Sequence, residues 1–333
     1  MKEEIFEASL TPEALKAQRD VPLTGKGLSP YGPSERSVAA MKSPVFDNER
    51  MWSLLRGSYD VHQHSGPSST THRLFDEIDF AIQGCYVEQA GIVFKNHDTP
   101  STRSVTLVQK VVDRWAEEQH KKKIELFGGV VLNFSVGGLN PDAVIAAYRQ
   151  GGKYVWMPNL DANHHRKVLD RKEGGGIDLI DENDNVVPKL KEILALMAET
   201  DMVLGLCHQN TRERIMVVRE AVKMGLKRIE INHVNLPLTR MTPEQAKMLA
   251  DMGAYIGIYA HSFALPRFSW DEVIALYKAV GSERIVLATD CGHVHHALPV
   301  DAMRRLILGF LIRGVPDKDV KLMCQTNAYN LLH

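Results

Sequence analysis

The sequence predicts an α/β protein whose main domain is a (β/α)8 TIM barrel, and three observations support this fold. Short apolar runs alternate with helical patterns eight times, at a spacing near the roughly thirty residues of a βαβ unit. The run at 285–288 and its counterparts are continuously apolar, as is typical of parallel strands covered on both faces. Residues 58–333 also come close to the usual barrel size of about 250 residues. A doubly wound open sheet is the second choice.

Residues 1–47 are expected to form an N-terminal arm, and residues 48–333 the barrel domain. The arm is rich in proline, glycine, serine and charged residues and shows little sustained periodicity. Thr11 and Pro12 stand in the order of an N-cap and a first helical residue, which predicts a short helix there. An arm of this kind either lacks fixed structure or wraps a neighbouring subunit, and we expect a homo-oligomer.

The barrel domain is expected to open with a helix at 48–55, which leads through Gly57 to a strand ending at His62 and His64. Each later strand is predicted from a short apolar run that ends in polar residues, and each helix from its helical periodicity. In chain order we predict helix 71–89, strand 91–97, helix 104–120, strand 125–133, helix 141–150, strand 154–161, helix 189–199, strand 202–208, helix 211–224, strand 228–233, helix 242–251, strand 255–261, helix 269–279, strand 284–290, helix 300–314 and helix 317–332.

A β-hairpin insertion is predicted at about 172–188, after the fourth strand. Two short apolar pieces flank a turn rich in aspartate and asparagine, which is a hairpin signature. We expect this insertion to lie over the mouth of the barrel.

Composition narrows the classes of partner. Forty basic residues stand against forty-one acidic ones, which argues against a nucleic acid held by bulk electrostatics. The four cysteines lie far apart without a Cys-x-x-Cys pair, so neither a disulfide framework nor a thiolate zinc site is indicated. The N-terminus does not have the build of a signal peptide, and no apolar run approaches the length of a membrane span. We therefore expect a cytoplasmic protein that acts on a small molecule.

Two histidines, His62 and His64, stand two residues apart at the predicted end of the first strand. Side chains alternate along a strand, so both imidazoles are expected on the same side. Two nitrogen ligands on one rigid strand suit an ion such as Zn²⁺. The alternative is a pair of surface or hydrogen-bonded histidines, since short motifs often match by accident.

Polar side chains also follow the other predicted strands, where barrel enzymes place their active sites. In strand order, these ends carry His62 and His64, Lys95 and His97, Asn133, Asn159 and Asp161, His208 and Asn210, His233 and Asn235, His261, and Asp290. Any one of these histidines could be an ordinary core or loop residue. The joint pattern instead predicts a site at this rim.

This pattern resembles the metal-dependent amidohydrolase superfamily, which has His-x-His after the first strand, single histidines after the fifth and sixth, and aspartate after the eighth. His62, His64, His208, His233 and Asp290 occur in that order. Residues 326–332 also resemble the family's closing turn. The resemblance covers about residue 55 to the end and implies a barrel hydrolase that binds one or two divalent ions, zinc or alternatively manganese.

One departure from the family concerns the bridging lysine or glutamate that usually follows the fourth strand, where this chain has Asn159 and Asp161. Lys95, after the second strand, is the candidate to replace it as a carbamate that binds metal. Equally, Lys95 could anchor a substrate carboxylate or pair with Asp161 or Asp290. The metal ligands implied are therefore His62, His64, His208, His233 and Asp290, with Lys95 as a further candidate.

The resemblance implies that Asp290 handles the proton of an attacking water, work that a carboxylate near a metal can perform. His233 would bind metal or polarise the substrate carbonyl, and Lys95 would assist. Asn159, Asp161, His97, His261 and His293 are the candidates for substrate binding. The favoured reaction is hydrolysis of an amide, lactam, lactone or related ester. The alternatives are a metal-dependent decarboxylase or hydratase and a barrel that only binds a metabolite.

Overall fold

A computed structural model describes residues 48–169, 174–264 and 269–333. The chain divides into two units, Met1–Phe46 and Asp47–His333. The predicted arm at 1–47 and the first residues of the predicted insertion, 172 and 173, lie outside the described residues. In the described part of the chain, no helix combines the length and the apolar character needed to cross a membrane.

The strands of the described residues are short, and all neighbouring strands pair in parallel. β3 and β4 follow each other across Gly128, so that the strands occupy eight successive positions. Their bounds are β1 Tyr59–Gln63, β2 Gly91–Phe94, β3 Glu125–Phe127, β4 Gly129–Val131, β5 Tyr154–Trp156, β6 Val203–Leu206, β7 Ile229–Ile231, β8 Tyr255–Tyr259 and β9 Ile285–Ala288.

The last strand returns to the first, as a barrel requires. The amide of Asp290 donates to the His62 carbonyl at 2.8 Å, and the amide of His64 donates to the Cys291 carbonyl at 2.9 Å. Asp60, which is buried in β1, accepts hydrogen bonds from the Thr289 amide at 2.9 Å and the Thr289 hydroxyl at 2.5 Å. The barrel fold predicted from the sequence is therefore confirmed, and this seam lies directly below His62 and His64.

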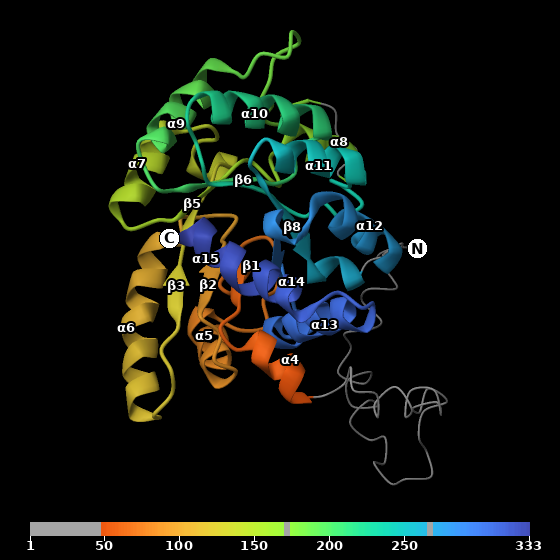
Figure 1. Ribbon diagram of the computed structural model, residues 1–333. Helices are drawn as coiled ribbons and strands as arrows, with labels where there is room; N and C mark the ends of the chain where they lie inside the picture. Colours follow the sequence, from red (N-terminus) through yellow and green to blue (C-terminus); the bar gives the residue numbers. More distant parts are fainter. Residues whose placement is uncertain (1–47, 170–173, 265–268) are drawn as a thin grey trace, which may run out of the picture. The chain divides into compact units, whose positions relative to one another are not determined.

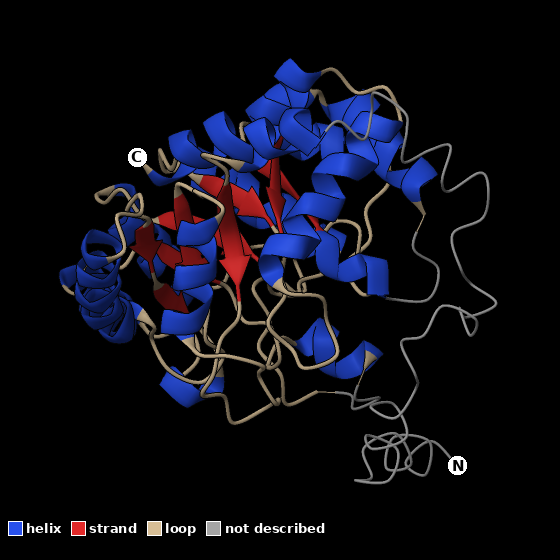
Figure 2. Cartoon of the chain, turned by 90° about the horizontal axis from the view of Figure 1, so that it is seen from below, coloured by secondary structure: helices blue, strands red, loops and turns tan. Residues whose placement is uncertain are grey.

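Helices surround the strands (Figures 1 and 2). On the outer face of β2, Ile92 and Phe94 pack with Phe80 of α5 and Val108 of α6, as the continuous apolar run predicts. The α-helices are α4 Asn48–Leu55, α5 Glu77–Tyr86, α6 Thr102–Glu118, α7 Pro141–Arg149, α8 Asn163–Val168, α9 Pro188–Ala198, α10 Thr211–Lys223, α11 Pro243–Asp251, α12 Trp270–Val280, α13 Pro299–Ile312, α14 Asp317–Lys321 and α15 Asn327–Leu332. Short turns η2 Phe134–Val136, η3 Ala260–Ala264, η4 Ser282–Arg284 and η5 Leu322–Thr326 complete the order.

The barrel interior is filled by side chains from alternating strand positions, among them Val61, Val93, Trp156 and Val286. Leu331 and Leu332 of α15 join this interior cluster together with Tyr59, at the start of β1. The C-terminal helix thus packs against the end of the barrel where the strands begin, and it leaves the opposite end to polar residues.

Several predicted boundaries were wrong. The helix expected at 71–89 begins only at Glu77, because the Asp76 side chain caps it by accepting from the Ile78 and Asp79 amides. The strand expected at 125–133 is interrupted at Gly128, and the helix expected at 317–332 contains the π-helical turn η5. The short helix α8 was not predicted.

Within the predicted insertion, Ile180 and Val186 form an antiparallel bridge. The turn between them is held by Asp181, whose Oδ1 accepts from the Asn183 and Asn185 amides at 2.9 and 2.8 Å.

Candidate metal centre

Three side chains converge where β1 and β9 end. The Nε2 atoms of His62 and His64 lie 3.4 and 3.1 Å from Oδ1 of Asp290. The possible ligand atoms of this group all lie within 4.8 Å of one another. Two imidazoles and a carboxylate at this spacing have the composition of a zinc site with room for further ligands.

His233 approaches the same carboxylate from β7. Its Nε2 lies 3.8 Å from Oδ2 of Asp290, and its ring centroid is 5.2 Å from that of His62. His233 and Asp290 both have left-handed backbones, with φ of 45° and 54°. A histidine in this conformation is uncommon and costs of order 1 kcal/mol or more, and such strain clusters at functional sites.

His208 lies next to His233. The ring centroids of His208 and His233 are 5.0 Å apart. His208 stacks on His165 with centroids 4.8 Å apart, and the two Nδ1 atoms are 2.7 Å apart. The structure therefore brings all five predicted histidine and aspartate positions together, with His62, His64 and Asp290 as the tightest group.

Hydrogen bonds fix which ring nitrogen carries the proton in His62 and His64. Nδ1 of His64 lies 2.8 Å from the Lys95 carbonyl, which can only accept, so this nitrogen carries the proton. Nδ1 of His62 lies 3.0 Å from the Tyr259 hydroxyl, whose own proton goes to Glu230 at 2.7 Å. Each ring is left with a lone pair on Nε2.

An unpartnered nitrogen at the centre indicates that these residues fit a divalent ion. Nε2 of His62 is buried and has no hydrogen-bond partner in the described part of the chain, and a bound ion would satisfy it. Metal-bound histidines typically donate their other nitrogen to a fixed acceptor, as both rings do here. His62, His64 and Asp290 could thus hold one ion, with His233 and His208 as the adjoining donors.

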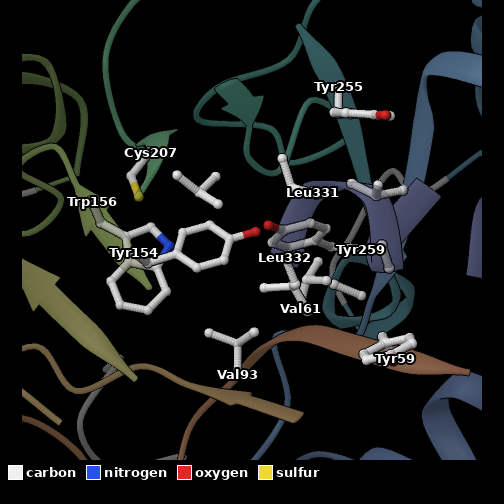
Figure 3. Close-up of a cluster of buried hydrophobic side chains, with 14 of the residues drawn as sticks. Tyr59, Val61, Val93, Tyr154, Trp156, Cys207, Tyr255, Tyr259, Leu331 and Leu332 are labelled. Carbon is white, nitrogen blue, oxygen red and sulfur yellow. The ribbon is translucent and has the colours of Figure 1, made fainter. Parts of the chain in front are cut away.

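A polar network lies inside the barrel beneath these rings. Tyr154 and Tyr259 both donate to the fully buried carboxylate of Glu230, at 3.0 and 2.7 Å. Figure 3 shows the two tyrosine hydroxyls facing one another. Asn232 donates to the Tyr259 hydroxyl at 2.6 Å and accepts from Cys207 Sγ at 3.1 Å. The network holds Tyr259 in the position from which it orients His62.

Replacing Tyr259 by phenylalanine is expected to lower zinc affinity roughly 10- to 100-fold, the usual cost of losing an outer hydrogen bond to a ligand. The barrel should remain folded, because the ring itself stays in place. Competition with a chromogenic chelator measures the affinity, and Tyr148→Phe, an exposed tyrosine on α7, is the matched control. Equal affinities for Tyr259→Phe and wild type would show that this hydroxyl does not orient a ligand.

Burial sets the charge state of the site. Burial lowers the pKa of His62, His64, His208 and His233 well below the ordinary value, so these rings are neutral at pH 7 and able to bind metal. Burial alone would raise the pKa of Asp290, but electrostatic interactions with the nearby His233, His261 and Lys95 outweigh burial and hold that pKa below its usual value. The carboxylate is therefore ionised.

Acidification below about pH 6.5 is expected to destabilise the metal-free protein. Unfolded histidine gains a proton near pH 6.5, whereas the buried rings resist protonation until lower pH, so the unfolded state takes up more protons. The pKa is lowered for seven histidines, His62, His64, His97, His208, His233, His293 and His296. Burial raises the pKa of four carboxyl groups, which oppose this trend, Asp60, Glu77, Glu213 and Glu230.

The histidines outnumber the opposing carboxyl groups. The folded state is therefore expected to lose free energy of unfolding as the pH falls below about 6.5. Denaturant unfolding of chelator-treated protein at pH 7.5 and 5.5 measures the difference. Greater stability at pH 5.5 would contradict this charge assignment.

Lys95 is 1% exposed and lies within the site. Its ammonium is 3.3 Å from Cys207 Sγ and 5.5 Å from the centroid of the Trp156 ring. Among the described residues it forms no ion pair, so the suggested pairing with Asp161 or Asp290 is not found.

The residues predicted to bind substrate lie in three places. Asn159 and Asp161 are engaged in loop structure, since Asn159 Oδ1 accepts from Asn133 at 2.7 Å and Asp161 Oδ2 accepts from the Phe134 amide at 2.7 Å. His97 lies beside the centre, its ring 4.5 Å from that of His64.

His261 and His293 form a second histidine cluster with His296. The His261 and His296 centroids are 4.3 Å apart, and those of His293 and His296 are 4.7 Å apart.

Three residues of this region were not predicted from the sequence to take part in the site. His165 and Tyr259 contact the predicted ligands, and Arg73 has a charge that acts on His64. His165 and Arg73 lie outside strand ends, where no pattern distinguished them. Tyr259 lies on a predicted strand, but its role depends on Glu230 of the neighbouring strand.

Solved structures share this fold. An amidohydrolase from Pseudomonas aeruginosa is 14% identical, with a TM-score of 0.58 over 86% of this chain and 97% of that one. A probable dipeptidase, PvdM, from the same organism is 10% identical, with a TM-score of 0.59 over 87% and 98%. A putative 2-pyrone-4,6-dicarboxylic acid hydrolase from Pseudomonas putida is 13% identical, with a TM-score of 0.53 over 83% and 97%. The barrel that the resemblance to amidohydrolases implied is thus confirmed.

No curated protein matches the sequence. Residues 57–257, which include every predicted metal ligand except Asp290, match the model of a family of unknown function, DUF6282. Because this match covers more than half of the chain, the protein belongs to the DUF6282 family.

Proposed function

We propose that this protein is a metal-dependent hydrolase that cleaves an amide, lactam, lactone or related ester bond of a small molecule. The observation that carries the proposal is the convergence of two histidines with unprotonated Nε2 atoms on the ionised Asp290. The barrel shared with an amidohydrolase and with a putative 2-pyrone-4,6-dicarboxylic acid hydrolase supports it.

His62, His64 and Asp290 would hold zinc or, alternatively, manganese, with His233 and His208 available to the same or a second ion. A divalent ion supplies Lewis acidity for a carbonyl group and lowers the pKa of water. The chain itself contributes neutral imidazoles in fixed tautomers, which need no deprotonation before they bind.

Asp290 is suited to move the proton of the reaction. Its Oδ1 faces His62 and His64, whereas its Oδ2 faces His233 at 3.8 Å. A carboxylate that is ionised at neutral pH can accept a proton from the attacking water and return it to the leaving group. His233, with Nε2 toward Asp290, would hold the substrate carbonyl beside that oxygen.

Lys95→Ala distinguishes the two roles open to Lys95. If the amine reacts with carbon dioxide to form a carbamate that bridges two ions, the variant should fall to one ion, and added short carboxylic acids should partly restore activity. If the ammonium binds substrate, metal content should stay unchanged and the Michaelis constant should rise. Metal analysis together with steady-state kinetics makes the measurement.

The test of the proposal is a screen of zinc-loaded protein against lactones, lactams, N-acyl compounds and aromatic carboxylates. Hydrolysis products that form only with metal, and not with chelator-treated protein, are expected. Carbon dioxide release without hydrolysis would point to decarboxylation. Unchanged compounds throughout, despite bound metal, would contradict the proposal.

A further inference from the structure

The backbone around Arg73 is held firmly beside the metal centre. Arg73 and His293 form an antiparallel bridge, and the Leu74 amide donates to the Gly292 carbonyl at 3.1 Å. From the other side, the Gly66 amide donates to the Phe75 carbonyl at 2.9 Å. Gly292 in turn packs so closely on His64 that an added Cβ would lie 1.8 Å from the His64 carbonyl oxygen. Arg73 is thus fixed between the loops that follow β1 and β9.

Part of the Arg73 guanidinium is buried without a hydrogen-bond partner among the described residues. Its Nε and Nη1 atoms are inaccessible to solvent and make no hydrogen bond within the described residues. A buried donor without a partner carries an uncompensated desolvation cost, which is larger for a charged group, and native proteins rarely leave such donors unsatisfied unless a ligand completes the site.

The charge of Arg73 acts on the metal centre. It contributes to the lowered pKa of His64 and of His293, and the Asp290 carboxylate counteracts the lowering that burial causes in the pKa of Arg73. Burial brings that pKa to about 10, so the side chain remains a cation at neutral pH.

A divalent ion at the metal centre would leave positive charge in excess around Arg73. Arg73 is a cation, and the ion would add two further positive charges. The facing carboxylates are Asp290 and, for Arg73, Asp98, which also accepts from the Ser69 amide and hydroxyl at 2.8 and 2.7 Å. An anionic ligand would balance the excess.

We propose that Arg73 binds an anionic oxygen group, a carboxylate or a phosphate, of the molecule that occupies the metal centre. The planar guanidinium offers paired N–H donors that match both groups. This inference rests on the proposed function and adds to it a substrate class, an acid whose charged group lies beside the bond to be cleaved.

Hydroxamates test this inference without knowledge of the substrate, because the hydroxamate group binds to the metal ion. Acetohydroxamate has no further charge. The monohydroxamates of malonic, succinic and glutaric acid add a carboxylate at three chain lengths, and phosphonoacetohydroxamate adds a phosphonate. Calorimetric titration of zinc-loaded protein compares their dissociation constants.

At least one acidic hydroxamate is expected to bind wild-type protein roughly 10- to 100-fold more tightly than acetohydroxamate, the range for a charge-assisted hydrogen bond. Arg73→Gln should remove this advantage and leave acetohydroxamate binding unchanged. Arg149→Gln, at the exposed C-terminal end of α7, is the matched control and should behave as wild type. If the carboxylate compounds show the larger gain in affinity over acetohydroxamate, the anion is a carboxylate. If phosphonoacetohydroxamate shows it, the anion is a phosphate.

Equal binding of acidic and neutral hydroxamates by wild-type protein would overturn the role of Arg73, and so would an advantage that persists in Arg73→Gln. Failure of acetohydroxamate itself to bind metal-loaded protein would instead contradict the metal centre. Circular dichroism and the zinc content of Arg73→Gln separate loss of the anion contact from loss of the fold.

Discussion

His62→Ala and His64→Ala are each expected to lose bound zinc and activity together while the barrel stays folded. Each change removes one of the two Nε2 lone pairs that the structure directs at Asp290. Loss of a direct ligand should lower zinc affinity by more than the roughly 100-fold that an outer hydrogen bond can cost. Metal analysis after dialysis, the rate on the substrate from the screen, and circular dichroism make the measurement.

His72→Ala is the control for these variants, because His72 is an exposed histidine close by in sequence. It should retain metal and fold as wild type does. Variants of His62 or His64 that keep full zinc would remove that histidine from the centre, and variants that unfold would favour a structural role.

Asp290→Asn is expected to cut turnover by roughly 10²- to 10⁴-fold, the contribution usual for a general base. The amide can still offer an oxygen to a metal ion but cannot accept a proton at neutral pH. The fold should persist for two reasons. The backbone hydrogen bond from the Asp290 amide to the His62 carbonyl is unchanged, and asparagine tolerates the left-handed φ of 54°.

Steady-state kinetics and metal analysis on Asp290→Asn make the test, with Asp142→Asn, an exposed aspartate at the start of α7, as control. Near-normal turnover in Asp290→Asn would assign the proton transfer to another group.

The fold could be predicted because barrel strands are covered on both faces, and their sequences are therefore continuous apolar runs. Boundaries were less predictable, because they depend on single contacts such as the Asp76 cap of α5. Alternation alone also misses a detail of β1. A shift in the pairing of β1 with β2 between Asp60 and Gln63 allows both Val61 and His62 to contact the barrel interior.

The candidate ligands could be predicted because parallel strands bring their C-terminal ends to one rim. Their orientation could not, since the tautomer of His62 depends on Tyr259 and Glu230, which meet only in the folded barrel. Arg73 lies on a loop. Its backbone reaches the centre by pairing with His293, a residue far from it in the sequence.

Anomalous diffraction at the zinc absorption edge, from crystals of zinc-loaded protein, tests the metal centre most directly. A peak is expected about 2.0–2.2 Å from Nε2 of His62, Nε2 of His64 and a carboxylate oxygen of Asp290. A map without a peak between these three groups, or with zinc bound only at the second cluster of His261, His293 and His296, would contradict the account.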